Sequence, residues 1–180
     1  MRSATIVLIA YGLMLVLGVT WSALPLPVVG EAPPDVAAVT AGYLGLTARR
    51  GPAGAVGAAV IVGYLADLLA GAPPGLLALT AGLVCVAAIG LQRRILVRGW
   101  GLTAGFAFAA AGFAIIAGLV IRIVVRGPVA GAGTELWALA RVCAVSALCG
   151  PLIIRLYRRI DAAFARTHRE RDHALEGLAP

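Results

Sequence analysis

The chain has 180 residues, of which 61% are hydrophobic and only 13% are charged, and its mean hydropathy is +0.97. This composition excludes a water-soluble globular domain and a disordered chain, because charged residues are too few for either. Three cysteines in 180 residues also exclude a disulfide-rich scaffold. We therefore predict an all-α integral membrane protein.

Apolar segments that are long enough, or nearly long enough, to cross a bilayer occur six times along the chain. A spanning helix needs about 20 apolar residues, because an α-helix rises about 1.5 Å per residue. The expected spans are 4–24, 35–48, 53–70, 74–92, 101–125 and 134–157. The second is the shortest, and Asp35 is placed after two prolines to cap its first turn. Pro74 suits the first turn of the fourth span.

Arginine distribution sets the expected orientation, because positive residues near span ends resist translocation. All 15 basic residues are arginine, and the formal net charge is +7. With both termini in the cytoplasm, 12 of the 15 arginines lie on the inner side. Without the second span, Arg93, Arg94 and Arg98 would move outside. We therefore predict six transmembrane helices with both termini cytoplasmic, and attribute the positive charge to topology rather than to a nucleic-acid partner.

The chain divides into an expected membrane domain, residues 1–160, and a cytoplasmic charged tail, residues 161–180. A cleaved signal sequence is the alternative for the first span, but the apolar run is long and lacks a small-x-small site near its end. The sixth span is expected to continue as a helix into the tail. That helical end could anchor on anionic lipid headgroups or dock a cytoplasmic partner.

Small residues four apart mark contact faces between membrane helices. The clearest row lies along the third span: Ala55, Ala59, Gly63, Asp67 and Gly71. We expect this row to pack against another helix of the same chain or against a second copy in a homodimer.

Three ionisable residues fall inside the expected spans, where an unpaired charge costs about 2.5–3.5 kcal/mol on insertion scales. They are Asp67, Arg122 and Arg141. Counting from the span ends places them about 6, 6 and 9 Å below the outer surface, in one layer. We predict an intramembrane cluster in which Asp67 pairs with Arg141 or Arg122, either to fix helix register or to line an outward-facing polar pocket.

Residues for catalysis are few. The three serines are Ser3, Ser22 and Ser146, and both histidines, His168 and His173, lie in the tail. An intramembrane Ser–His pair is therefore not available, and the histidine spacing is not that of zinc ligands. We expect no enzyme, no metal and no cofactor.

The segment 63–79, GYLADLLAGAPPGLLAL, resembles the signature region of the bacterial rod-shape-determining MreD family. Two further features are similar: the Pro34-Asp35 start of the second span, which ends in Arg49-Arg50, and the basic loop after the fourth span. The chain departs from the family in its double proline at the turn and in its longer tail. The matching positions are Pro34, Asp35, Gly63, Asp67, Gly71, Pro74 and Gly75.

The resemblance implies a non-enzymatic scaffold of the cell-elongation complex, located in the bacterial inner (cytoplasmic) membrane. Its implied partner is MreC, with further links to the MreB filament, the RodA polymerase and its penicillin-binding partner. The family is similar in fold to the substrate-binding subunits of energy-coupling-factor vitamin transporters. The alternative function is therefore binding of a vitamin or other small molecule for such a transporter.

Overall fold

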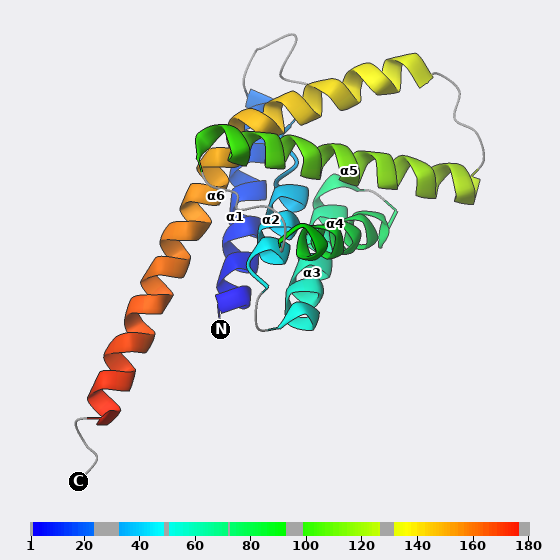
Figure 1. Ribbon diagram of the computed structural model, residues 1–180. Helices are drawn as coiled ribbons and strands as arrows, with labels where there is room; N and C mark the ends of the chain where they lie inside the picture. The colour runs from blue at the N-terminus through cyan, green and yellow to red at the C-terminus, as the bar shows by residue number, and fades with distance from the viewer. Residues whose placement is uncertain are drawn as a thin grey trace.

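The computed structural model describes residues 2–23, 33–48, 51–71, 73–92, 99–126 and 132–176. All regular structure in these ranges is α-helical, which confirms the all-α part of the predicted fold class (Figure 1). The helices are α1 (Arg2–Ala23), α2 (Val36–Leu46), α3 (Pro52–Ala70), α4 (Leu76–Gln92), α5 (Trp100–Arg126) and α6 (Ala132–Glu176).

Four of these helices, α1, α3, α5 and α6, are long and apolar enough to cross a membrane. The protein is thus a membrane protein by the length and composition of its helices. The other two apolar helices are shorter, with 11 residues in α2 and 17 in α4. At about 1.5 Å per residue, α2 extends about 16 Å, roughly half of a hydrocarbon core. Six spans therefore remain a prediction.

The short helix α2 lies at the centre of the fold and contacts each of the other five helices. Every residue from Val36 to Gly45 is buried. The helix is rich in alanine and glycine, and these small residues let neighbours approach closely. A Cβ atom on Gly42 would lie 2.7 Å from the Phe106 ring, and one on Gly45 would lie 2.5 Å from the Cys85 carbonyl oxygen.

Helices α3 and α4 pack closely through the predicted row of small residues. Ala55, Ala59, Gly63 and Asp67 are all buried. At Gly63 there is no room for a side chain, because a Cβ atom would meet the Leu77 carbonyl group and the Ala78 Cα. The predicted packing face is therefore confirmed within one chain from Ala55 to Asp67, whereas Gly71, the last member of the row, is exposed. The homodimer stays a prediction.

The last helix, α6, runs without interruption from Ala132 to Glu176 and changes direction along its length (Figure 1). Pro151 lies inside it, and a proline removes one helix hydrogen bond and favours a kink. The first part of α6 lies beside α5, where Gly150 meets Ala107. The predicted continuation of the sixth span as a helix beyond residue 157 is confirmed.

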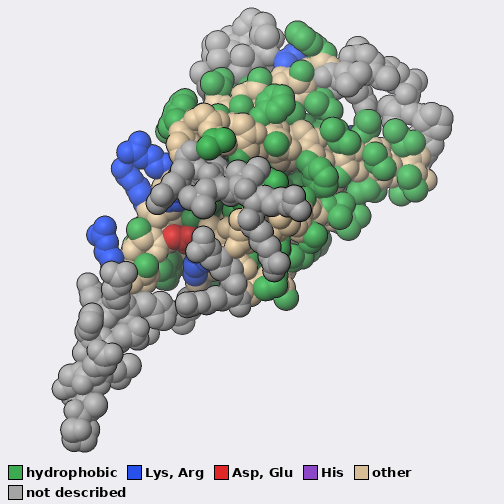
Figure 2. Space-filling view, in the orientation of Figure 1, with side chains coloured by type: hydrophobic (Ala, Val, Ile, Leu, Met, Phe, Trp, Pro, Cys, Tyr) green, Lys and Arg blue, Asp and Glu red, His purple; other side chains and the backbone are tan. Residues whose placement is uncertain are grey.

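The outer surface of this bundle is largely apolar. Large exposed side chains on α5 include Ile116, Val120, Val124 and Val125. In the space-filling view, hydrophobic side chains cover much of the face along α5 (Figure 2). Such a surface suits contact with lipid chains.

Candidate functional site

Asp67 is 2% exposed and binds the start of the next helix. Its Oδ2 accepts hydrogen bonds from the backbone N–H groups of Gly75, at 2.9 Å, and Ala78, at 3.2 Å. Its Oδ1 accepts one from the N–H of Leu77, at 2.9 Å. The first N–H groups of a helix have no partner within it, so Asp67 of α3 serves as the cap of α4.

The turn between α3 and α4 is shaped by the motif residues. Gly71 ends α3 in the left-handed conformation, with φ of 60°, and its N–H donates to the Asp67 carbonyl oxygen. Gly75 also has a positive φ, 96°. Both conformations favour glycine. Pro74 lies in this turn, two residues before the first residue of α4, so the expected first-turn position of Pro74 is wrong.

A second carboxylate, Asp35, caps the start of α2, as predicted. Its Oδ1 accepts a hydrogen bond from the Ala38 N–H at 2.8 Å. Its own N–H donates to Ser146 Oγ of α6 at 2.9 Å, and Ser146 is fully buried. Pro34, just before it, is buried as well. Irregular backbone is tolerated among apolar helices where protein covers it and satisfies its polar groups, and here α6 does so.

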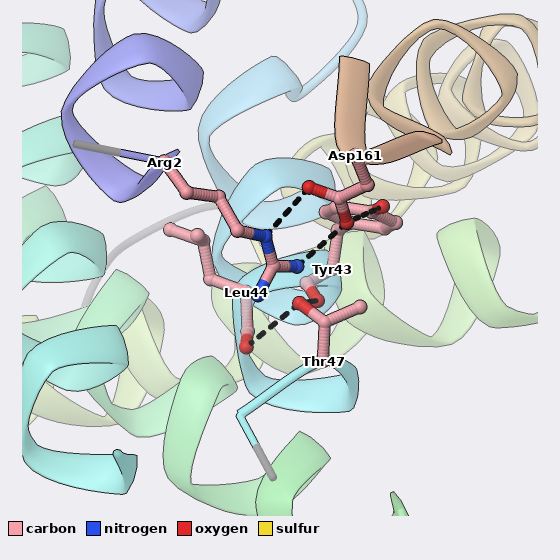
Figure 3. A network of polar contacts seen from close by, with 5 residues as sticks. All are labelled: Arg2, Tyr43, Leu44, Thr47 and Asp161. Carbon is pink, nitrogen blue, oxygen red and sulfur yellow. Dashed lines mark hydrogen bonds and ion pairs between the residues drawn. The ribbon is translucent and has the colours of Figure 1, made fainter. Parts of the chain in front are cut away.

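A third polar cluster joins α1, α2 and α6 (Figure 3). Arg2 donates from Nε to Asp161 Oδ1 and from Nη2 to Asp161 Oδ2, both at 2.6 Å. Tyr43 Oη donates to Asp161 Oδ2, also at 2.6 Å. This is a bidentate arginine–carboxylate pair, whose charge-assisted hydrogen bonds are strong and fix the relative orientation of the two side chains. Asp161 was expected to open the solvated tail, and instead it holds three helices together.

One turn earlier on α6, Tyr157 extends the contact between α2 and α6. Its hydroxyl lies 2.8 Å from Thr40 Oγ, and both residues are fully buried. The Tyr43 and Tyr157 rings are 5.3 Å apart between centroids. The central helix is thus linked to α6 by polar contacts at Asp35, Thr40 and Tyr43.

The predicted cluster of Asp67, Arg122 and Arg141 is assembled only in part. Arg122 is exposed and borders a cavity of about 230 Å³ that is also lined by Pro74 and Gly75. Arg122 of α5 therefore lies beside the α3–α4 turn, whose backbone N–H groups bind Asp67. Arg141 is half-buried, and its guanidinium carbon lies 5.8 Å from the centre of the Trp137 ring. The hydrogen-bond partners of the Asp67 carboxylate are backbone amides, because a charge-assisted cap satisfies both of its oxygens locally.

The seven motif positions all belong to starts, ends or contacts of helices. Pro34 and Asp35 begin α2, Gly63 permits the contact of α3 with α4, and Asp67 with Gly71, Pro74 and Gly75 builds the turn. Sequence reasoning missed the group of Arg2, Tyr43 and Asp161. No signal links residues 159 positions apart, although an acid just beyond a span with an arginine at the other terminus is compatible with such a pair.

The arrangement can hold helices at fixed positions. The carboxylates of Asp35, Asp67 and Asp161 each accept hydrogen bonds, from backbone amides or from Arg2 and Tyr43. Within the described ranges, no three His, Cys, Asp or Glu side chains gather closely enough to hold a metal ion.

Fold and site together define an all-helical membrane protein whose two short helices begin at carboxylate caps, Asp35 for α2 and the buried Asp67 for α4. No protein-family model, curated protein or solved structure matches this chain.

Proposed function

We propose that this protein is a non-enzymatic scaffold of the bacterial cell-elongation complex in the cytoplasmic membrane, with six spans and both termini inside. In this role it binds MreC and helps to connect MreB with RodA and its penicillin-binding partner. The basis for this particular complex is the resemblance of segment 63–79 to the MreD signature.

The observation that supports a scaffold is the set of hydrogen bonds that Asp67 accepts from the backbone. An acid that works in catalysis or proton transfer must exchange its proton with a substrate, with water or with another side chain. Both oxygens of Asp67 instead accept hydrogen bonds from the backbone of α4. The motif therefore builds a defined helical hairpin, which is what a protein that positions its partners requires.

One contact supports placing the start of α1 and the C-terminal part of α6 on the same side of the membrane. Arg2, at the start of α1, and Asp161, near the C-terminal part of α6, are in direct contact. These two positions therefore lie at the same side of the fold. The positive-inside rule favours the cytoplasm for this side, because most arginines lie near it under the six-span topology.

Co-purification with MreC tests the partner directly. The tagged full-length protein is co-expressed with MreC from the same organism and isolated in mild detergent, with an unrelated six-span membrane protein as the control. We expect MreC to elute with the tagged protein and not with the control. If both proteins are folded and monodisperse but elute separately, the proposed partner is wrong.

A further inference from the structure

One stripe of exposed residues runs along α6 and changes in character from apolar to basic. At 100° per residue, Trp137, Leu148, Leu152, Arg155, Arg159 and Arg166 fall within an arc of about 60°. All six side chains are exposed, including Trp137 at 63%, Leu148 at 68% and Leu152 at 63%. We call these six residues the α6 stripe.

The α6 stripe joins an apolar part to a basic part. Trp137 and Leu148 precede Pro151, near which α6 changes direction, and Leu152 and the three arginines follow it. Arginines gather at the cytoplasmic boundary of a membrane, next to the apolar side chains that contact lipid. Leu152 lies three residues before Arg155 in the part of α6 after Pro151, so an exposed apolar side chain adjoins the first exposed arginine there.

The basic end of the stripe is not neutralised by the acid nearest to it. Between residues 152 and 166 the only acid in the sequence is Asp161. Around the helix axis, its position is at least about 120° from those of Arg155 and Arg159. Its carboxylate is held by Arg2 and Tyr43. The opposite side of this segment is buried through Ile153, Ile154 and Tyr157. The contact with Arg2 thereby fixes the rotation of the helix that turns the three arginines outward.

In the space-filling view, arginine side chains project from the edge along which the C-terminal part of α6 runs (Figure 2). An acidic soluble partner would account for the arginines but not for the exposed leucines in line with them. An anionic bilayer accounts for both, since its chains contact the leucines and its phosphates contact the arginines.

We propose that Arg155, Arg159 and Arg166 bind the headgroups of anionic phospholipids, with Asp161 as the positioning residue that aims them. This binding is independent of the proposed role in cell elongation. Each arginine near an anionic surface contributes about a fivefold gain in affinity, so three contribute on the order of a hundredfold.

The test uses the full chain in detergent, titrated with phosphatidylglycerol or, as the zwitterionic control, phosphatidylcholine. Bound lipids are counted by native mass spectrometry. We expect a clear preference for phosphatidylglycerol in the wild type, a loss of at least about tenfold in R155Q/R159Q/R166Q, and retention in R155K/R159K/R166K, which keeps the charge. D161N raises the net charge by one, which by charge alone would strengthen the preference, so a partial loss in this variant is the result that the positioning role predicts.

Two results would overturn the proposal. One is a wild type that binds both lipids equally; the other is a glutamine variant that elutes as a folded, monodisperse protein and keeps the full preference. If the three arginines are instead needed for binding a purified acidic protein while phosphatidylglycerol has no effect, the surface is a protein-docking site and the lipid assignment is wrong.

Discussion

A buried carboxylate in an apolar fold is destabilising unless hydrogen bonds compensate for the lost water. Asp67 gains three such bonds from the start of α4. The benefit is mutual, because the same bonds satisfy N–H groups that have no partner inside the helix. A single side chain thereby determines where α4 begins and how it meets α3.

The first prediction concerns this cap. Asp67→Ala leaves buried N–H groups without partners, and each such group costs about 1–3 kcal/mol. We expect a loss of at least about 2 kcal/mol, seen as a lower midpoint of thermal unfolding in detergent. Leu68→Ala, at a neighbouring position that is 62% exposed, is the matched control and should change the midpoint little.

The second prediction concerns the contact beside the cap. Gly63→Ala places a Cβ atom against the backbone of Leu77 and Ala78, which must move apart. Overpacking of this kind costs about 1–3 kcal/mol. Gly57→Ala is the matched control on the same helix, because nothing lies within 4 Å of its added Cβ atom. An equal effect of the two substitutions on the unfolding midpoint would contradict the close contact of α3 with α4.

At the scale of single residues, the sequence predicts what is local and misses what is distant. The cap at Asp35 follows from its position after two prolines, and the structure confirms it. The backbone partners of Asp67 lie 8–11 residues away across a turn, and charge alone suggested an arginine instead. The contact of Arg2 with Asp161 spans 159 positions, and no local pattern encodes it.

At the scale of helices, apolar composition identifies membrane segments but not their surroundings. Helices α2 and α5 are both strongly apolar, yet α2 is buried among five neighbours while α5 exposes much of its surface. Lipid and protein interiors are similarly apolar, so hydropathy does not separate the two environments. The central place of α2 could not be predicted for this reason, although its small residues were a signal of close packing.

The third prediction tests the central position of α2. Ala41 is fully buried, and a leucine there has to displace neighbouring helices. We expect Ala41→Leu to lower the yield of monodisperse protein and the unfolding midpoint, with a cost of about 1–3 kcal/mol. Ala87→Leu adds the same volume at an exposed position of α4 and should be tolerated. Equal tolerance of both leucines would show that α2 is not tightly enclosed.

At the scale of the whole molecule, the Arg2–Asp161 pair joins the first helix of the chain, α1, to the last, α6. The order of the helices along the chain and their apolar character could be predicted from the sequence. The enclosure of α2 could not, because it depends on contacts between distant helices. Asp161 connects α1 and α2 to α6 and so determines how the C-terminal part of α6 is held.

The fourth prediction measures this connection by a double-mutant cycle. The side chains of Arg2 and Asp161 are 42% and 22% exposed, so we expect a coupling energy of only about 0.5–1 kcal/mol. In practice Arg2→Gln, Asp161→Asn and their combination are compared by thermal unfolding, where 1 kcal/mol corresponds to about 2–4 °C. The double variant should lose less than the sum of the single losses. Strict additivity would mean that the pair contributes no mutual stabilisation.

The proposed role in cell elongation is tested most directly by depleting the protein in its own cells and imaging cell shape on rich medium. We expect rods to swell and become round, and plasmid-borne wild type and Leu68→Ala to restore the rod while Asp67→Ala does not. Unchanged shape, with growth lost only when a vitamin is scarce, would contradict the scaffold and favour the transporter subunit.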